Sequence, residues 1–141
     1  MIVGVTGADG LLGTHVRAYL HGIPGMHVRA AGRQTFEAGA LTTFVEGCDA
    51  IIHLAGMNRG DDLVVAETNV ALAWQLVTAL EETGSQAHVL FSSSTHIERD
   101  TPYGASKREV ASLLEAWETG SGGKFTNVIL PGVFGEGGKP F

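Results

Sequence analysis

The 141-residue sequence has a single cysteine, few aromatic residues and little charge of either sign. The lone Cys48 excludes a disulfide framework within the chain and is typical of a protein from a reducing compartment. Acidic side chains outnumber basic ones by 15 to 9, and the net charge of −6 argues against nucleic acid as a partner. Charged residues make up 17% and apolar residues 44%, which is typical of a folded globular domain.

Long apolar runs are also missing. No run approaches the roughly 20 residues that span a membrane, and no charged and then apolar leader precedes the first predicted strand. We therefore expect a soluble, cytoplasmic domain with no membrane partner. The length is that of one domain, enough to bury roughly two-thirds of the unfolded surface in a core.

Glycine, by contrast, is abundant, and three of the 20 glycines organise the beginning of the chain. The apolar run 2–5 is typical of a buried parallel strand, and Gly7, Gly10 and Gly13 follow it at a spacing of three. Gly7 and Gly10 permit a tight turn whose backbone N–H groups can approach a phosphate, and Gly13 lets a helix pack close to the strand. The pattern predicts a site for the pyrophosphate of a dinucleotide at the helix N-terminus. The alternative is a turn that serves packing only.

Segments with strand and helix patterns alternate along the rest of the chain. This order predicts an α/β fold, a Rossmann-like doubly wound parallel sheet of about five strands in three layers. The predicted strands are 2–5, 27–31, 50–55, 87–91 and 125–130. The predicted helices are 10–21, 36–46, 63–83 and 103–118, of which the second is short and interrupted by Gly39. Residues 135–141 are expected to form a loop, and an ending at such a loop suggests that residues 1–141 are an incomplete chain.

Polar and glycine-rich segments follow the predicted strands, at the edge where doubly wound sheets bind their ligands. In chain order they are the glycine turn, Gly32-Arg33, Ala55-Gly56 and Ser92-Ser93-Ser94. Tyr103 and Lys107 open the helix that comes next. The recurrence of such segments at one edge indicates a binding site more strongly than any one motif does.

Tyr103 and Lys107 are four residues apart on a predicted helix, so the phenol and the ammonium lie on the same face. A free tyrosine has a pKa of about 10 and is a poor base at neutral pH. We expect the Lys107 cation to lower the pKa of Tyr103 and to fit it for proton transfer with a substrate hydroxyl. By itself this spacing more often marks an ordinary helix surface, but the preceding serines and the glycine turn favour catalysis.

The end of the second predicted strand bears on the choice of cofactor. An acidic residue there would accept a hydrogen bond from the ribose 2′-hydroxyl, whereas an arginine can pair with a 2′-phosphate. The segment holds Arg33 and has no carboxylate before Glu37. We therefore expect NADP(H) to be favoured and NAD(H) to be possible. In the alternative interpretation Arg33 is only solvated.

Together these segments resemble the short-chain dehydrogenase/reductase superfamily over essentially the whole chain, specifically its extended branch of nucleotide-sugar epimerases, dehydratases and reductases. The motifs that carry the resemblance are the Gly-x-x-Gly-x-x-Gly spacing, segments 49–56, 91–94 and 130–135, Asn69 in the long helix, and Tyr103-x-x-x-Lys107. Segments 53–59 and 98–104 are similar, more narrowly, to the capsular-polysaccharide reductase/epimerase subgroup.

The resemblance implies an NAD(P)-dependent oxidoreductase or epimerase that transfers hydride to or from a nucleotide-activated sugar. It implies that Tyr103 is the acid/base, that Lys107 assists it and binds the nicotinamide ribose, and that Ser94, or failing that Ser93, binds the substrate oxygen. Asn69 would be a structural or water-relay position, and pairing of the long helices suggests a homodimer. The residues expected to bind the cofactor are Gly7, Ala8, Asp9, Gly10, Leu11, Gly13, Arg33, Leu54, Ala55, Gly56, Asn69, Lys107, Pro131, Gly132 and Val133.

The sequence also departs from the extended branch. Only 15 residues separate Arg33 from Asp49, so a strand that the branch usually has there is expected to be missing. The segment between Ser94 and Tyr103 is short as well. We expect residues 1–141 to form an NAD(P)-binding domain without the C-terminal lobe that recognises the sugar. A dinucleotide-binding module or fragment without turnover is therefore the alternative to an enzyme.

Two other kinds of site are not expected. The six histidines have no convincing ligand spacing with cysteine or carboxylates, so we expect no metal site. Ser93 and Ser94 lack the Gly-x-Ser-x-Gly context of a hydrolase nucleophile.

Overall fold

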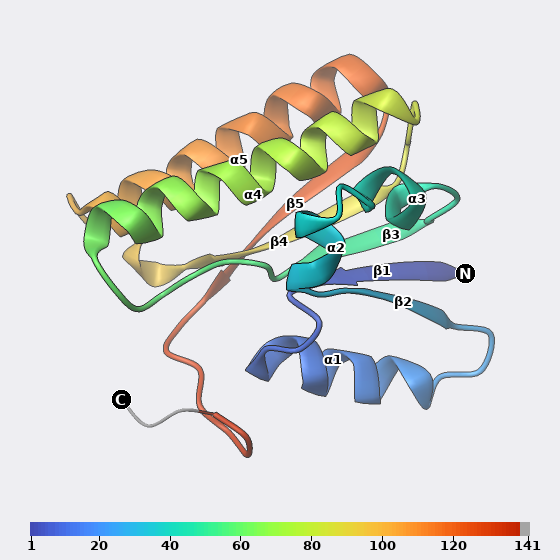
Figure 1. The fold of residues 1–141 in the computed structure, drawn as a ribbon, viewed down its shortest axis with the longest axis horizontal. Coiled ribbons are helices and arrows are strands. Elements are labelled where there is room, and N and C mark those ends of the chain that lie inside the picture. The colour runs from blue at the N-terminus through green and yellow to red at the C-terminus, as the bar shows by residue number, and fades with distance from the viewer. Residues whose placement is uncertain (139–141) are drawn as a thin grey trace.

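The computed structural model describes residues 1–138, which contain one sheet of five parallel strands (Figure 1). The strands are β1 (Ile2–Thr6), β2 (His27–Ala31), β3 (Ala50–His53), β4 (His88–Ser94) and β5 (Lys124–Leu130). Their order is β2-β1-β3-β4-β5, so β2 and β5 are the edge strands. The direction of winding reverses between β1 and β3, which is where doubly wound sheets bind their ligands. The predicted Rossmann-like α/β fold is confirmed.

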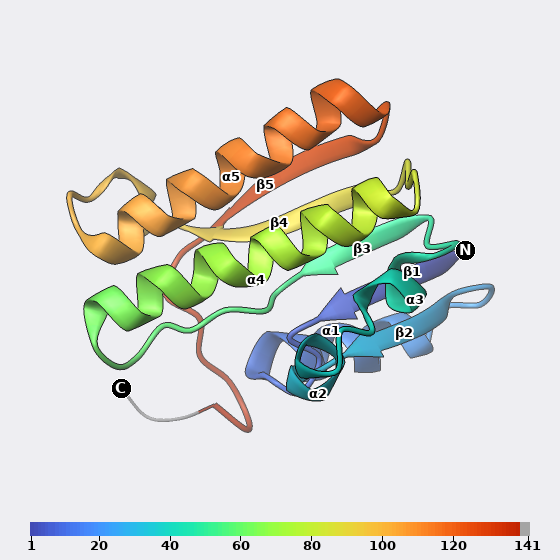
Figure 2. The same ribbon diagram turned by 45° about the horizontal axis from the view of Figure 1, so that its top comes forward.

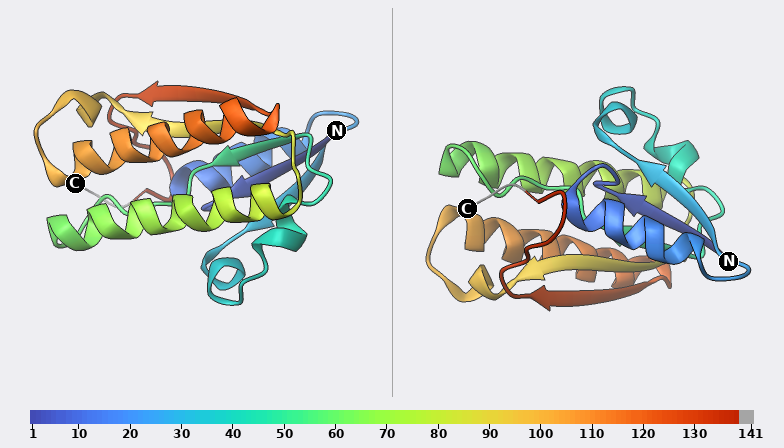
Figure 3. Two further views of the ribbon diagram at one scale, coloured as in Figure 1. Left: turned by 90° about the horizontal axis from the view of Figure 1, so that it is seen from above. Right: turned by 90° about the horizontal axis from the view of Figure 1, so that it is seen from below.

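Helices cover both faces of the sheet and complete three layers. On one face lies α1 (Leu11–His21), and on the other α4 (Asp62–Glu82) and α5 (Pro102–Ser121) lie side by side (Figure 1, Figure 2). Seen from above, α4 and α5 lie in front of the sheet, and seen from below α1 lies in front of it (Figure 3). The shorter elements are α2 (Arg33–Glu37) and α3 (Leu41–Val45) after β2, and the 3-10 helix η1 (Thr95–Glu98) after β4.

The main core lies between the sheet and helices α3, α4 and α5. Its largest fully buried apolar side chains are Ile51, Leu76, Leu80, Leu114, Val45, Val89 and Val110. On the opposite face, α1 packs against β1 and β2 and buries Val3 and Val5. Ile52 and Leu90, farther along that face, are only half-buried. The two faces are therefore covered unequally in the described part of the chain.

The segment between β2 and β3 differs in part from its prediction. The single helix expected at 36–46 is wrong: the structure has two short helices there, α2 and α3. Gly39 between them has a φ of 64°, which a continuous right-handed helix does not allow. The expected loss of a strand between Arg33 and Asp49 is confirmed, since the described residues of this segment form helices and turns.

The ends of two strands differ from their predictions by two residues or more. β3 ends at His53 and not at Ala55. β4 continues through Ser92–Ser94, because those residues pair with residues 128–130 of β5. The loop predicted for 135–141 is observed as far as residue 138, and its last three residues lie outside the described ones.

Helix α4 is the one helix among residues 1–138 that is long and apolar enough, by length and composition, to cross a membrane. No segment of that kind was expected from the sequence. In the structure Val65, Ala73, Leu76 and Leu80 of this helix are buried, and α4 packs against α3 and α5. A core helix of a globular domain has a similar composition, so the packing of α4 accounts for the part of its apolar surface that is buried.

Candidate active site at the carboxyl edge of the sheet

The glycine turn brings the start of α1 to the carboxyl end of β1. Gly7 has a φ of 63°, and the Gly10 N–H donates to the Gly7 carbonyl oxygen at 3.0 Å. A Cβ on Gly13 would overlap the same carbonyl oxygen and lie 2.8 Å from Ala8 Cα, so only glycine allows this approach. Within the described residues, no side chain caps α1 at Gly10. The first N–H groups of α1 are therefore suited to an anionic ligand.

A buried threonine joins this turn to the end of β3. Thr6 Oγ1 accepts hydrogen bonds from Leu54 N at 3.1 Å and Ala55 N at 3.2 Å, and lies 2.8 Å from His53 Nδ1. Because both lone pairs of the hydroxyl are engaged, its proton points to Nδ1, and the neutral His53 ring carries its own proton on Nε2. Burial, with a smaller contribution from Lys107, lowers the pKa of His53 to about 3, so the ring is neutral.

The loop after β3 is fixed from two sides. A Cβ on Gly7 would lie 2.7 Å from Ala55 N, so the loop touches the glycine turn directly. From α4, the Asn69 side chain accepts from Met57 N at 2.6 Å and donates to Met57 O at 2.9 Å. The buried Asn69 thus occupies a structural position behind the loop, the first of the two roles expected for it. A Cβ on Gly56 would lie 3.0 Å from Asn69 Oδ1, so this glycine is also closely packed.

The turn from β4 into α5 fixes the place of Tyr103. Thr101 caps α5 by accepting a hydrogen bond from Gly104 N at 3.1 Å, and Pro102 occupies the first helical position. A Cβ on Gly104 would lie 2.6 Å from His96 O, so η1 packs tightly against the start of the helix. Tyr103 is half-buried there, and its ring meets the His96 ring edge to face.

Lys107 is buried one helical turn after Tyr103. Its Nζ donates to Ser92 O at 3.1 Å and lies 4.8 Å from the centroid of the Phe91 ring and 5.5 Å from that of Tyr103. Burial lowers the pKa of Lys107 from 10.5 to about 8, because desolvation penalises the ammonium. The structure therefore places the expected Tyr103 and Lys107 together at the end of β4.

The expected effect of Lys107 on Tyr103 is wrong for this structure. Burial raises the pKa of Tyr103 above 10.0, and a hydrogen bond with Ser94 opposes that rise. The Lys107 ammonium donates to Ser92 O and lies 5.5 Å from the centroid of the phenol ring, and the pKa of Tyr103 follows burial and Ser94 and not this cation. The Ser94 oxygen accepts from His96 N at 3.1 Å, which leaves the hydroxyl proton for the phenol.

The two serines proposed for the substrate oxygen differ in their surroundings. Ser93 is 4% exposed, and its hydroxyl oxygen has no hydrogen-bond partner in the part of the chain that the structure describes. Ser94 is half-buried and interacts with Tyr103. The geometry thus favours Ser94, as the sequence did.

Two further segments of the predicted cofactor site reach the same edge. Arg33 is exposed and begins α2 directly after β2. Pro131, Gly132 and Val133 follow β5 as an exposed segment. The chain then runs to α1, where His15 Nε2 donates to Glu136 O at 2.9 Å (Figure 1).

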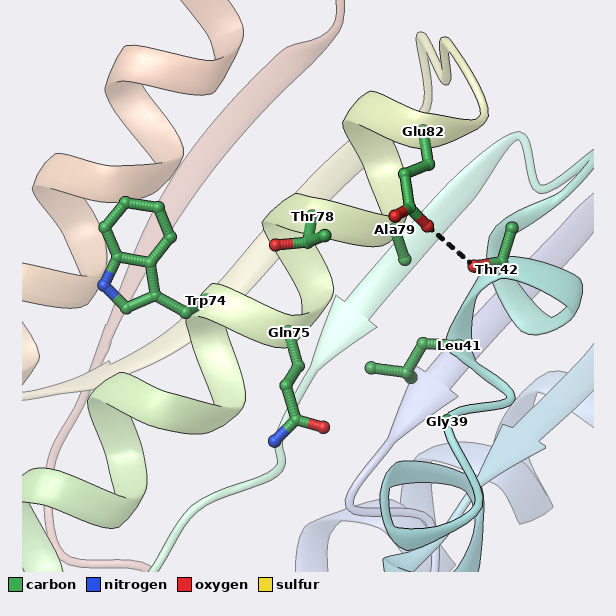
Figure 4. A pocket seen from close by; sticks show the side chains of 8 residues that line it. All are labelled: Gly39, Leu41, Thr42, Trp74, Gln75, Thr78, Ala79 and Glu82. Atoms are coloured by element: carbon green, nitrogen blue, oxygen red, sulfur yellow. Dashed lines mark hydrogen bonds between the residues drawn. The ribbon is translucent and has the colours of Figure 1, made fainter.

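A hollow of about 280 Å³ lies elsewhere, between α3 and the second half of α4 (Figure 4). Across it, Thr42 Oγ1 donates to Glu82 Oε2 at 3.2 Å, and Trp74 on its rim is 51% exposed. Sequence reasoning did not find it, because its lining residues form no motif. Among residues 1–138, no three His, Cys, Asp or Glu side chains gather where they could hold a metal ion.

Comparison with known proteins adds to this geometry. Residues 3–141 match the NAD dependent epimerase/dehydratase family. The chain is 33% identical over 141 residues to UDP-2-acetamido-2,6-beta-L-arabino-hexul-4-ose reductase of Pseudomonas aeruginosa, covering 99% of this chain and 38% of that protein. It therefore spans less than half the length of this curated relative.

Solved structures share the fold. The capsular polysaccharide assembling protein CapF of Staphylococcus aureus superposes with a TM-score of 0.81 at 28% identity, over 99% of this chain and 37% of CapF. UDP-glucuronic acid 4-epimerase of Bacillus cereus, in complex with NAD, has a TM-score of 0.78 at 17% identity, over 96% of this chain and 58% of the epimerase. The second likeness concerns the fold alone.

Proposed function

This chain belongs to the NAD dependent epimerase/dehydratase family, and we propose that it is the cofactor-binding half of an enzyme that uses NAD(P) to act on a nucleotide-activated sugar. One observation carries the proposal. The uncapped glycine turn before α1 and the Tyr103–Lys107 pair of α5 both follow the carboxyl ends of parallel strands in one sheet. Hydride transfer to or from a sugar needs both a dinucleotide site and a proton-transfer group.

The residues at this edge fit a dinucleotide. The close approach at Gly13 places the N-terminus of α1 where its N–H groups can bind the pyrophosphate. Lys107 offers an ammonium that can donate to ribose hydroxyls. When bound, the nicotinamide supplies or accepts the hydride, and the protein has to position it and move the proton.

Tyr103 is proposed to move the hydroxyl proton of the sugar. Because burial raises its pKa, the phenol is protonated at neutral pH and suited to donate to a sugar oxygen during reduction. Ser94, which interacts with the same phenol, would hold that oxygen. In the oxidative direction the phenolate is needed, so we expect the oxidative rate to rise with pH.

Arg33 supports NADP(H) as the favoured cofactor, with NAD(H) also accepted. It is exposed at the carboxyl end of β2, where a guanidinium can pair with a 2′-phosphate. The reductase name of the relative from Pseudomonas aeruginosa supports a UDP-sugar as substrate and reduction as the net reaction.

The proposal extends to the assembly of the protein and to its surroundings in the cell. The exposed Leu63, Val64 and Trp74 of α4 support a homodimer through α4 and α5. The acidic net charge supports a protein without nucleic acid or membrane partners, and the single cysteine supports a cytoplasmic one. A second candidate function is a dinucleotide-binding module without turnover, which the glycine turn and the free N-terminus of α1 would support by themselves.

Calorimetric titration of the chain with NADPH and with NADH tests the cofactor proposal. Tryptophan fluorescence is a poor probe, because Trp74 lines the hollow beside α3 and Trp117 packs against Gly123. We expect both cofactors to bind and Lys107→Met to weaken both. Absence of heat with either cofactor would contradict the proposal.

Turnover then separates the two candidate functions. In the natural full-length protein, Tyr103→Phe should abolish reduction of a UDP-sugar ketone while cofactor binding persists. Cofactor binding without turnover of any nucleotide-sugar by the wild-type protein would favour the binding module.

A further inference from the structure

The glycine turn carries a carboxylate that reaches a neighbouring strand. Asp9 lies between Gly7 and Gly10, and its side chain is 82% exposed. A Cβ on Gly32, the residue after β2, would overlap Asp9 Oδ2, so the carboxylate lies directly over the Gly32 backbone. The Ala8 N–H donates to Ala31 O at 3.3 Å, which holds the turn beside the end of β2.

Arg17 on α1 orients this carboxylate. Its Nη1 donates to Ala8 O at 2.9 Å and lies 3.5 Å from Asp9 Oδ1. One carboxylate oxygen thus faces Arg17 and the other faces Gly32. Asp9 therefore has a preferred direction, although its side chain is exposed.

Opposite charges meet at this point of the sheet. Arg33 follows Gly32 directly, so a cation and the Asp9 anion flank the carboxyl end of β2. In doubly wound sheets an acidic group at that end accepts a hydrogen bond from the 2′-hydroxyl of the adenosine ribose. Here the acid comes from the turn after β1 and not from β2 itself.

We propose that Asp9 is a specificity-determining residue, which accepts the ribose 2′-hydroxyl and repels a 2′-phosphate, and so limits the preference for NADP(H) that Arg33 creates. This inference rests on the proposed dinucleotide-binding function. It assigns the two charges opposite effects: Arg33 favours NADP(H) and Asp9 favours NAD(H).

Dissociation constants for NADPH and NADH, measured by calorimetry on wild type and Asp9→Asn, test the proposal. We expect the ratio of the NADH constant to the NADPH constant to rise about tenfold in Asp9→Asn, because the variant loses the repulsion and the charged acceptor. Arg33→Gln should move the ratio in the opposite direction. Glu81→Gln, which removes the same charge from the far end of α4, should leave the ratio unchanged.

A second variant separates the effect of the position of the Asp9 carboxylate from the effect of its charge. Gly32 has extended backbone, with a φ of −97°, so Gly32→Ala is tolerated locally and its methyl group displaces the Asp9 carboxylate. We expect a smaller rise in the same ratio, at unchanged net charge. An unchanged ratio for Asp9→Asn, whether both constants stay the same or both change by the same factor, would overturn the role of Asp9. Failure of wild type to bind either cofactor would instead overturn the proposed function and this inference with it.

Discussion

The turn from β1 into α1 and the turn from β4 into α5 reach the same edge of the sheet by different means. In the first turn, backbone meets backbone, because Gly7 and Gly13 have no side chains in the way. In the second turn, polar side chains are enclosed: Lys107 and Ser93 are buried, and Ser93 lacks a hydrogen-bond partner among the described residues.

The two turns therefore relate stability to function in opposite ways. A glycine that allows close packing serves the fold and the ligand at once, so its replacement should harm both. A buried ammonium or an unpartnered hydroxyl costs stability and is retained only if the chemistry needs it. Substitutions in the first turn should therefore destabilise the chain, and selected ones in the second should stabilise it.

The largest expected effect is at Gly13. Gly13→Ala places a methyl group against the Gly7 carbonyl and the Ala8 backbone, neither of which can move easily. We expect the free energy of unfolding to fall by roughly 3 kcal/mol or more in a urea titration. Gly120→Ala is the matched control, since that helical glycine has open space around it; it should gain up to about 1 kcal/mol. Equal stability of the two variants would refute the steric explanation.

Lys107→Met, in contrast, should raise the free energy of unfolding. The lowered pKa of Lys107, about 8 in place of 10.5, corresponds to a penalty of roughly 3 kcal/mol at about 1.4 kcal/mol per pKa unit. The penalty is complete below pH 8 and is relieved as the pH rises toward 10.5, because the unfolded chain binds this proton more tightly. We expect Lys107→Met to be about 2 kcal/mol more stable at pH 7, after loss of its hydrogen bond to Ser92.

Urea titrations between pH 7 and pH 10.5 check this expectation. The wild type should gain stability over the interval relative to the variant. Lys124→Met changes an exposed lysine at the start of β5 and should follow the wild type at every pH. A destabilised Lys107→Met variant at pH 7 would show that the lysine contributes more through packing than it costs through burial.

Thr6→Val tests the junction beside the glycine turn. The variant keeps the shape of the side chain but leaves Leu54 N and Ala55 N without their acceptor, and His53 Nδ1 without its donor. We expect a loss of about 2 kcal/mol in thermal or urea unfolding. Thr6→Ser retains the hydroxyl and should recover most of the loss. If the serine variant is as unstable as the valine variant, the methyl group and not the hydroxyl is responsible.

The smallest expected effect is at Ser93. Removal of its buried, unpartnered hydroxyl by Ser93→Ala should raise the free energy of unfolding by about 1 kcal/mol. Ser106→Ala provides the contrast, because the equally buried Ser106 donates to Tyr103 O at 2.7 Å and should lose stability. Calorimetry of thermal unfolding distinguishes a rise from a fall in the melting temperature.

A structural feature could be predicted from the sequence where the residues that determine it lie within one segment. The spacing of Gly7, Gly10 and Gly13 and the alternation of strands and helices predicted the fold and its first turn. Contacts between distant segments were not predictable in the same way. Thr6 and His53 are 47 residues apart, and only the pairing of β1 with β3 makes them neighbours. The extension of β4 through its serines likewise depends on β5.

Charge and burial were the least predictable properties. The four-residue spacing correctly placed Tyr103 and Lys107 together, but it said nothing of the Ser92 carbonyl that takes the ammonium. Desolvation of the phenol then outweighs its hydrogen bond with Ser94, and the pKa of Tyr103 rises. Asp9 is a similar case, because its effect depends on a strand to which it does not belong.

The position of β5 at the edge of the sheet has a practical consequence for anyone who purifies residues 1–141. One side of this seven-residue strand pairs with β4, and no described strand pairs with the other side, where the Phe125 N–H donates to Glu118 Oε1. Lys124 and Pro131 discourage strand addition at its two ends, but Ile129 between them is 48% exposed. Self-association through this edge should grow with protein concentration, and Ile129→Lys should suppress it.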